Sequence, residues 1–357
     1  MKILYIMHVE WGWIKQRPHF IAEELSKSHH VRVYYQKMYS RFKRSENVSG
    51  IKRSAFFTIP KKSNIFLGIV NNVILKIFFY TIIKLGKYNF IYVTHPDQLM
   101  YLPELTIPVI YDCMDDHSSF GDLGKDGDLK RNEIELFSKA DLVLFSSFYL
   151  KEKNEMYVDQ KKTELLFNGI SERLKEIMRD NKGEKILLIK NIFYIGTIAE
   201  WFDFSAIELI LERCPSVRFT IIGPADIKLP DLGDRVLYMG PVDHSQLNKI
   251  VEDADVFIMP FVLNELIRSV DPVKMYEYIS FCRPIISIHY EELDKFSGFV
   301  NFYKDRDQLA IICDLINSSS LEGYSREQAG SFISKSTWAK RVERRLGVYI
   351  KNKRFYE

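Results

Sequence analysis

A cluster of acidic residues follows an apolar run in the first half of the 357-residue sequence. Asp112, Asp115 and Asp116 lie within five positions, and His117 comes next. Neighbouring carboxylates raise one another's pKa, so one of them could act as a general base at neutral pH. Alternatively, these residues cap a helix and are otherwise solvated, or they bind a divalent metal. No further oxygen ligands follow at a useful spacing for a metal. We favour a base, because three acids at the end of a predicted strand outweigh the capping role. Asp115 is our first candidate and Asp112 our second.

A second polar segment begins at Asp271 and Pro272, which together predict a helix capped by the aspartate. The free amides of Val273 and Lys274, with the Lys274 ammonium group, would form an anion site at that helix N-terminus. Glu277 lies three positions after Lys274 on the same face and could accept hydrogen bonds from a ribose. The alternative is an ordinary ion pair between Lys274 and Glu277 on a surface helix.

A loop with two tryptophans separates the first apolar run from a predicted helix. Trp11 and Trp13 could stack on sugar rings, and Arg17 near the helix start favours an anionic group. This loop could therefore hold a sugar- or phosphate-bearing ligand. The alternative is that the indoles cover an apolar core and Pro18 only starts the helix.

Two turns in the second half of the chain also follow apolar runs. Gly196 and Thr197 end one run, and a Gly-Pro turn ahead of Val242 ends another. Glycine lets a backbone approach a diphosphate closely, although one Gly-Thr pair is a weak signal.

These residues can form binding sites only if the strands and helices of the chain bring them to the edge of a sheet. Short apolar runs alternate with helix-period segments, which predicts parallel sheets covered by helices on both faces. Ligands bind beyond the carboxyl ends of such strands. The expected strands of a first series are Lys2–His8, Val31–Gln36, Phe90–Thr94, Val109–Cys113, Leu142–Ser146 and Glu164–Phe167. Those of a second series are Ile192–Gly196, Val217–Gly223, Arg235–Met239, Val256–Pro260 and Pro284–Ile288.

Composition supports a globular α/β chain with an uneven charge distribution. A hydrophobic content of 46% and a charged content of 27% exclude a disordered or collagen-like chain. The four cysteines are too scattered for a zinc cluster or a disulfide framework, so we expect reduced thiols. The net charge of +3 divides into +12 over residues 1–87, −15 over 88–334 and +6 over 335–357.

The apolar segment 65–85 has nearly the length of a bilayer span, but Asn71, Asn72, Lys76 and Lys84 interrupt it. We therefore do not expect a spanning helix. It is either a largely buried helix of an α/β domain or an amphipathic helix in a lipid interface. The opening residues lack the apolar length and cleavage site of a signal peptide. Residues 336–353 predict a basic amphipathic helix.

Short motifs are distributed over nearly the whole chain. They are W-x-x-Q-R-P (Trp13–Pro18), YDCMDD (Tyr111–Asp116), ADLV (Ala140–Val143), FNGI (Phe167–Ile170), YIG (Tyr194–Gly196), IIGP (Ile221–Pro224), MGPV (Met239–Val242), ADVFIMPF (Ala254–Phe261) and DPVKMYEY (Asp271–Tyr278). Through these motifs, which stand in family order, the sequence resembles a two-domain GT-B glycosyltransferase of bacterial cell-surface polysaccharide biosynthesis, similar to family 4 and glucuronosyltransferase-like members.

The resemblance implies two doubly wound Rossmann-like domains in tandem. An acceptor-binding domain would cover 1–175, a nucleotide-sugar-binding domain 176–335, and residues 336–357 would form a helix that returns to the first domain. It also implies that Glu277 binds the ribose, Lys274 with nearby amides binds the diphosphate, and the Val242 region binds the base.

Three departures from the family pattern bear on the chemistry. Ser269 stands where many retaining relatives have the first glutamate of a pair, and Ile198, Ala199 and Glu200 replace the usual arginine and lysine. Phosphate neutralisation would then fall on Lys274, with Arg268 as a second candidate. Met114 also replaces a histidine that retaining relatives often have, so a carboxylate base and an inverting reaction are our hypothesis.

We therefore expect a metal-independent enzyme that moves a sugar from a nucleoside-diphosphate sugar, UDP-sugar first, to a hydroxyl of a lipid-linked or polysaccharide acceptor. Asp116 and His117 would help the tryptophan loop to bind that acceptor, and no bound cofactor is needed. We expect a cytoplasmic enzyme held on the inner face of the cell membrane by anionic lipid, with no nucleic acid partner. The alternatives are a nucleotide-sugar epimerase of the same fold, and a catalytically silent subunit that docks a partner enzyme at the membrane.

Overall fold

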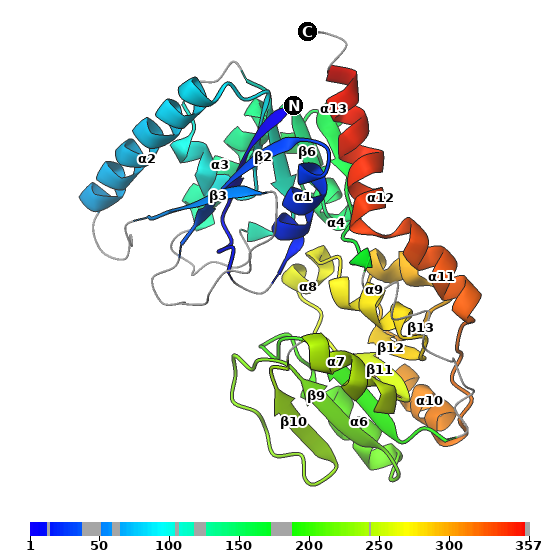
Figure 1. The fold of residues 1–357 in the computed structure, drawn as a ribbon. Coiled ribbons are helices and arrows are strands. Elements are labelled where there is room, and N and C mark those ends of the chain that lie inside the picture. Colours follow the sequence, from blue (N-terminus) through cyan, green and yellow to red (C-terminus); the bar gives the residue numbers. More distant parts are fainter. Residues whose placement is uncertain are drawn as a thin grey trace. The chain divides into compact units, whose positions relative to one another are not determined.

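The computed structural model describes residues 1–12, 15–37, 51–58, 65–103, 107–117, 126–172, 188–242 and 244–353. The chain forms two compact units (Figure 1). The first comprises Met1–Phe167 together with Trp338–Glu357, and the second comprises Asn168–Thr337. The chain thus leaves the first unit at Phe167, ahead of the boundary expected at 175–176.

The described part of the first unit contains a seven-stranded sheet in the order β3-β2-β1-β4-β5-β6-β7. All neighbouring strands are parallel. The strands are β1 (Lys2–Met7), β2 (His30–Gln36), β3 (Lys52–Phe56), β4 (Phe90–Val93), β5 (Val109–Cys113), β6 (Leu142–Phe145) and β7 (Thr163–Leu165). The parallel arrangement was expected, whereas β3 was not.

Side chains of β1 alternate between two apolar clusters on opposite faces of this sheet. Ile3, Tyr5 and Met7 belong to one cluster. Leu4 and Ile6 belong to the other. Because successive strand residues point to opposite faces, an entirely apolar strand needs cover on both sides.

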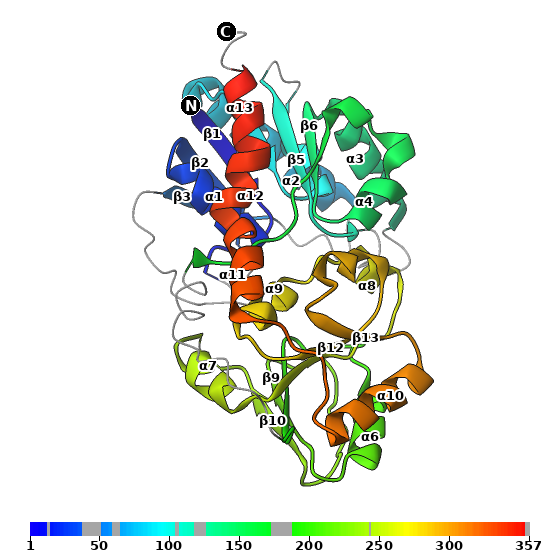
Figure 2. The same ribbon diagram turned by 90° about the vertical axis from the view of Figure 1, so that its right-hand side faces the viewer.

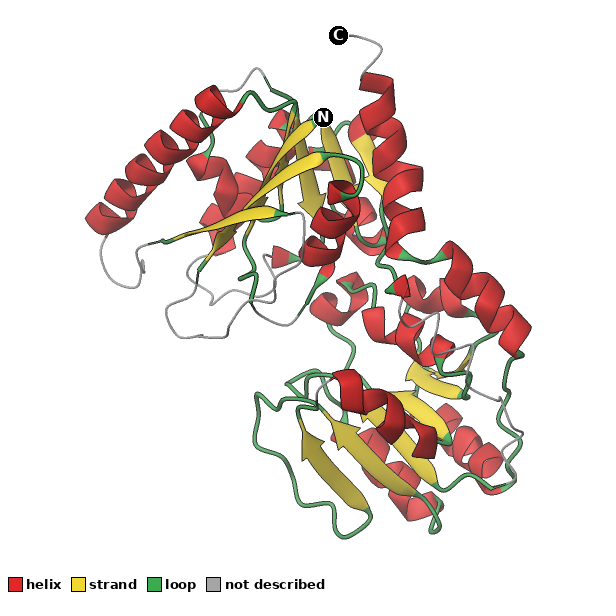
Figure 3. Cartoon of the chain, viewed as in Figure 1, coloured by secondary structure: helices red, strands yellow, loops and turns green. Residues whose placement is uncertain are grey.

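Helices supply that cover on both faces (Figure 3). Helix α1 packs into the cluster of Ile3, and α2 and α3 pack into the cluster of Leu4. The helical elements are α1 (Arg17–Ser26), α2 (Ile65–Gly86), a 3-10 helix (Pro96–Tyr101), α3 (Asp126–Lys139) and α4 (Phe148–Lys153).

Helix α2 buries only a narrow side. Leu75, Phe79 and Ile83 are buried in the sheet's core, while most other described residues of the helix are exposed. By length and composition alone, Phe66–Gly86 could cross a membrane: its mean hydropathy is 1.9, and 22% of its most apolar window is buried. The sequence allowed a largely buried helix, but α2 is largely exposed.

The described part of the second unit contains a six-stranded sheet in the order β10-β9-β8-β11-β12-β13. All its neighbouring strands are parallel. The strands are β8 (Asn191–Ile195), β9 (Arg218–Ile222), β10 (Val236–Gly240), β11 (Val256–Met259), β12 (Ile285–Ile288) and β13 (Val300–Tyr303).

Helices again cover both faces of this sheet. Helices α6 and α10 pack on one face. Helices α9 and α11 pack on the other, together with α7. The helices of this unit are α6 (Phe204–Arg213), α7 (His244–Ile250), α8 (Glu265–Ser269), α9 (Val273–Ser280), α10 (Arg306–Asn317) and α11 (Arg326–Lys335). The expected pair of doubly wound domains is confirmed.

The C-terminal helical segment returns to the first unit, as expected (Figure 2). It comprises α12 (Trp338–Val342), one π-helical turn (Glu343–Gly347) and α13 (Val348–Lys353). Its residues Trp338, Val342, Leu346 and Ile350 are buried in the apolar cluster that also holds the buried side of α1. The Trp338 ring stacks on Phe20 with centroids 5.3 Å apart.

From the charge distribution we also expected the two basic ends of the sequence to lie on one domain beside the apolar segment 65–85, and this placement is wrong for the C-terminal end. The basic C-terminal segment does not lie beside α2, because it packs into the apolar cluster of Ile3, whereas α2 packs into the cluster on the opposite sheet face. The C-terminal segment and α2 thus belong to one unit but lie on opposite faces of its sheet.

Candidate functional site

Three histidines meet at the carboxyl edge of the first sheet. The register pairs Ile6 with Val93, so His8 and His95 follow their strands at the same level. His117 follows β5, the next strand. Ring centroids are 5.2 Å apart for His8 and His95, 5.7 Å for His8 and His117, and 4.5 Å for His95 and His117.

The hydrogen bonds of these rings differ. His8 Nδ1 is bonded to Thr94 Oγ1 at 2.7 Å, and His95 Nδ1 accepts from the Asp97 amide at 3.2 Å. His117 is buried, and its Nε2 atom has no hydrogen-bond partner among the described residues. This nitrogen is therefore a buried polar atom whose hydrogen bond is unmade within the described part of the chain.

Two of the three histidines, His8 and His117, are uncharged at neutral pH. Desolvation, followed by the neighbouring His95, lowers the pKa of His8 to about 3. Desolvation, followed by His95 and His8, holds the pKa of His117 well below its usual range. Neutral imidazoles can exchange hydrogen bonds with sugar hydroxyls. Within the described ranges, no group of three or more His, Cys, Asp and Glu residues could hold a metal ion. The sequence analysis had singled out only His117 of these three.

Asp115 is partly exposed beside this cluster. Its carboxylate forms no hydrogen bond or ion pair within the part of the chain that the structure describes. Desolvation raises its pKa to about 6, with Arg17 opposing that shift and Asp112 and Asp116 adding to it. A carboxylate with that pKa can take up a proton near neutral pH, as a general base must.

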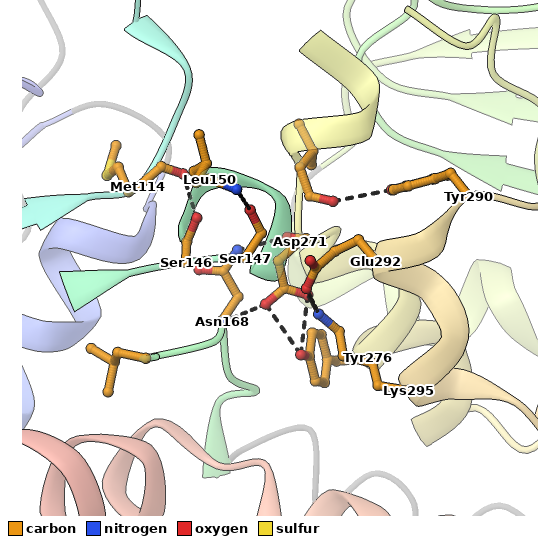
Figure 4. Close-up of polar contacts among 12 residues, drawn as sticks. Met114, Ser146, Ser147, Leu150, Asn168, Asp271, Tyr276, Tyr290, Glu292 and Lys295 are labelled. Atoms are coloured by element: carbon orange, nitrogen blue, oxygen red, sulfur yellow. Dashed lines mark hydrogen bonds and ion pairs between the residues drawn. The ribbon is translucent and has the colours of Figure 1, made fainter. Parts of the chain in front are cut away.

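The loop that carries Asp115 is fastened to the end of the next strand. Ser146 Oγ donates to the Met114 carbonyl at 2.8 Å (Figure 4). Ser147 then accepts from the Leu150 amide at 3.2 Å and caps α4. These bonds hold the backbone next to Asp115 in place.

The Asp112 carboxylate forms an ion pair with the guanidinium group of Arg17. Arg17 Nε donates to both carboxylate oxygens at 3.0 Å, and Nη2 donates to Oδ1 at 2.7 Å. Arg17 Nη1 also donates to the Leu166 carbonyl at 2.6 Å. The Arg17 and Asp112 side chains are 5% and 0% exposed, respectively. The pair is therefore a structural ion pair, which fits neither Asp112 as the base nor Arg17 as a ligand-binding residue.

The remaining residues that we expected to bind the acceptor are not gathered into one site by the structure. Trp11 is buried in the core with its ring 5.2 Å from that of His19, so it covers the core rather than offering a stacking surface. Asp116 is buried and forms an ion pair with Lys153 at 2.7 Å. Trp13 lies outside the described residues.

In the second unit, Asp271 does not cap α9. Pro272 occupies the N-cap position, and no side chain caps the helix. Asp271 is instead buried: its Oδ2 atom accepts from the Asn168 amide at 2.6 Å, and its Oδ1 atom accepts from Lys295 at 2.8 Å (Figure 4). The Tyr276 hydroxyl donates to the same carboxylate at 3.1 Å. The expectation of a capping aspartate was wrong, because these more distant donors take its carboxylate.

The helix start itself keeps the expected polar groups. The Val273 and Lys274 amides face no capping side chain, as an anion site at a helix N-terminus needs. Lys274 Nζ forms an ion pair with Glu277 at 2.8 Å, and both side chains are partly exposed. Arg268 pairs with Glu291 at 3.1 Å, on an exposed surface. The ion pair between Lys274 and Glu277 is present, and the anion site at the helix start would use the same lysine.

Glycines let three strand ends of this unit approach closely. The Gly196 amide donates to the Ile222 carbonyl, and the Gly223 amide donates to the Gly240 carbonyl, both at 2.9 Å. Gly223 has a φ of +143°, and a Cβ atom there would lie 1.9 Å from the Gly196 carbonyl oxygen. Gly223 had not been singled out, although the IIGP motif contains it.

Thr197 and Val242 lie at the same sheet edge as these glycines. The Thr197 carbonyl accepts from the Tyr194 hydroxyl at 2.8 Å. Val242 is partly buried against the core of the sheet face that α9 covers.

Two sequence comparisons bear on this site. Residues 189–311 match the family model described as "Glycosyl transferases group 1". The chain is also similar to the putative teichuronic acid biosynthesis glycosyltransferase TuaH of Bacillus subtilis, with 23% identity over 205 residues. That match covers 52% of this chain and 52% of the relative, about half the relative's length.

Solved structures resemble the entire chain. Sucrose-phosphate synthase of Thermosynechococcus elongatus has a TM-score of 0.70 at 14% identity, covering 100% of both chains. HepE of Anabaena with UDP and glucose has 0.67 at 14% identity, covering 96% of this chain and 97% of its own. The lipopolysaccharide outer core galactosyltransferase WaaB has 0.63 at 12%, covering 96% and 98%. Residues 189–311 thus match the group 1 glycosyl transferase model, and the entire chain has the two-domain fold of these solved structures.

Proposed function

We propose that this protein transfers a sugar from a UDP-sugar to a hydroxyl group of a lipid-linked or polysaccharide acceptor. The observation that carries the proposal is the uncapped start of α9, with Lys274 and Glu277 one turn apart, inside the group 1 domain. HepE, a protein of the same fold, has been crystallised with UDP and with UDP-glucose.

The donor would bind to the second unit. The Val273 and Lys274 amides and the positive end of the α9 dipole suit a diphosphate. Lys274 would turn from Glu277 to the phosphates, and Glu277 would accept hydrogen bonds from the ribose. Gly196 and Gly223 stand at closely spaced strand ends and have no side chains. Backbone atoms would therefore lie beside the donor at these two positions.

Asp115 would act as the general base on the first unit. Its carboxylate takes the proton of the acceptor hydroxyl while the hydroxyl oxygen forms a bond to the anomeric carbon of the donor sugar. The bond from that carbon to the diphosphate oxygen breaks, and UDP leaves with the electron pair. The positive charge at the start of α9 stabilises the leaving diphosphate. Attack from the opposite side inverts the anomeric configuration.

The acceptor class is supported by relatives rather than by a residue. TuaH is named for teichuronic acid biosynthesis, and WaaB for the outer core of lipopolysaccharide. Both names refer to bacterial surface glycans, which favours a glycan or lipid-linked acceptor here. The cluster of His8, His95 and His117 offers hydrogen-bonding groups for its hydroxyls.

The test is a screen of UDP-sugars with the full chain, first by thermal shift and then by release of UDP in the presence of glycan acceptors. We expect one sugar to stabilise the protein and to be transferred. Isomerised sugar without any acceptor would show an epimerase instead. A chain that binds no UDP by calorimetry would be a silent subunit, and the proposal would fail.

A further inference from the structure

Helix α2 exposes an unusually large apolar surface. Nine large apolar side chains along the helix are exposed: Phe66, Leu67, Ile69, Val73, Ile74, Ile77, Phe78, Tyr80 and Leu85. Scattered exposed apolar residues are normal on a soluble protein, but a continuous group of this size marks an interaction surface. We call these nine residues the α2 apolar face.

The opposite side of α2 explains why the apolar face is turned outward. Phe79 packs edge-to-face on Phe56 with ring centroids 5.3 Å apart, and it stacks against Tyr101 at 6.2 Å. Leu75 and Ile83 are buried in the same cluster. Because this side belongs to the core of the first sheet, α2 cannot leave it to span a bilayer without exposing that core. The helix can only lie along a surface.

The charges around the face identify its partner. Lys76, Lys84 and Lys87 are exposed on and just after the helix, which contains no aspartate or glutamate. These three lysines are part of the net charge of +12 over residues 1–87. A helix with apolar side chains outward and lysines among them fits a lipid interface, where lysine stems bury and the ammonium groups reach anionic headgroups.

We propose that the α2 apolar face inserts into the interface of an anionic bilayer, the inner face of the cell membrane, with α2 parallel to the membrane plane. The C-terminal helices take no part, since they cover the opposite face of the sheet. Docking in this way would hold the first unit beside lipid-linked acceptors. The binding itself does not depend on the proposed reaction, so each can fail alone.

The experiment is co-sedimentation of the full chain with vesicles of phosphatidylcholine alone or mixed with phosphatidylglycerol. We expect binding only to the anionic vesicles at about 0.1 M salt and much weaker binding at about 1 M, where charges are screened. Lack of binding to anionic vesicles at low salt by the folded chain would overturn the proposal.

Matched variants locate the surface. Ile77→Ser should weaken binding to anionic vesicles about tenfold, and the pair Ile69→Ser with Ile77→Ser should abolish it. Ile311→Ser is the control, because Ile311 is as exposed as Ile77 but lies on α10 of the second unit. Lys76→Glu with Lys84→Glu should weaken binding mainly at low salt. All variants should keep the parent melting temperature and UDP binding, since none of these side chains is buried.

Two results would contradict the assignment. If Ile311→Ser weakens vesicle binding as much as Ile77→Ser does, the α2 apolar face is not the docking surface. The second result is a chain that binds no vesicles and sediments as a dimer. If Ile77→Ser dissociates that dimer, the α2 apolar face is an interface between two copies of the chain.

Discussion

Asn168 donates two hydrogen bonds to Asp271, across 103 positions of sequence. Its backbone amide bonds the Asp271 carboxylate at 2.6 Å, and its side-chain amide bonds the Asp271 carbonyl at 2.7 Å. Asn168 is the first residue of the second unit, and Asp271 precedes the helix that we expect to bind the diphosphate. Nearby, the Ile170 amide donates to the Ser336 carbonyl at 2.9 Å, which joins the outgoing and returning chain segments.

This relationship predicts that Asp271 stabilises the second unit rather than binding donor. Asp271→Asn should lower the stability of this unit by about 2–4 kcal/mol, because it removes a buried charge that Lys295 and the Asn168 amide both bond. Differential scanning calorimetry would measure the shift, with the exposed Asp226→Asn as control. An unchanged melting temperature together with lost UDP affinity would assign Asp271 to the ligand instead.

Arg17 and Asp112 should behave as a structural pair. Asp112→Asn and Arg17→Met should each destabilise the first unit by about 3–5 kcal/mol, because each leaves the partner charge buried without compensation. Thermal unfolding of the first unit measures this. The exposed pair of Lys139 and Glu135 on α3 is the control, and Glu135→Gln there should change stability by well under about 1 kcal/mol. A stable but inactive Asp112→Asn variant would restore Asp112 as a candidate base.

Asp115 predicts a characteristic pH dependence of activity. Its pKa is raised to about 6, and only the deprotonated carboxylate can accept a proton, so kcat/KM should rise up to about pH 6 and level off above it. Asp115→Asn should abolish turnover with unchanged UDP affinity. Initial rates across pH, with calorimetric UDP binding, test both. Full activity of Asp115→Asn would remove it as the base.

The same raised pKa has a consequence for stability. A carboxyl group whose pKa is higher in the folded than in the unfolded state favours folding when it is protonated. Its contribution therefore diminishes as the pH rises from the ordinary value near 4 through about 6. Asp115→Asn removes this cost, so the variant should melt at a higher temperature than the parent at pH 7 and show little difference at pH 4. Glu135→Gln should show no such pH-dependent gain.

Lys274 and Glu277 should determine donor affinity. Lys274→Ala and Glu277→Ala should each weaken UDP binding by about 10- to 100-fold, the range for lost hydrogen bonds to charged groups. Isothermal titration calorimetry measures this, with Lys304→Ala as control, since Lys304 is exposed in the same unit. Equal affinities of all three variants would show that the pair is only a surface ion pair.

Much of the architecture follows from local patterns in the sequence. Apolar runs separated by helix-period segments predict parallel sheets, and most expected strands form within one or two residues of their predicted ends. Two strands were missed for a physical reason. The β3 segment Lys52–Phe56 is mostly charged or small, and β13 (Val300–Tyr303) is only partly buried, so neither has the buried apolar run that signals a parallel strand.

By itself, the sequence determined most of the elements and which polar residues follow the strand ends, because apolar periodicity and turn residues act over a few positions. Only the tertiary structure decided how those polar residues pair. Arg17 reaches Asp112 across 95 positions, and Asn168 reaches Asp271 across 103, which no local pattern records. The same holds for α2: its composition allowed a buried helix, and its outward apolar face exists because the sheet core has room for only one side of it.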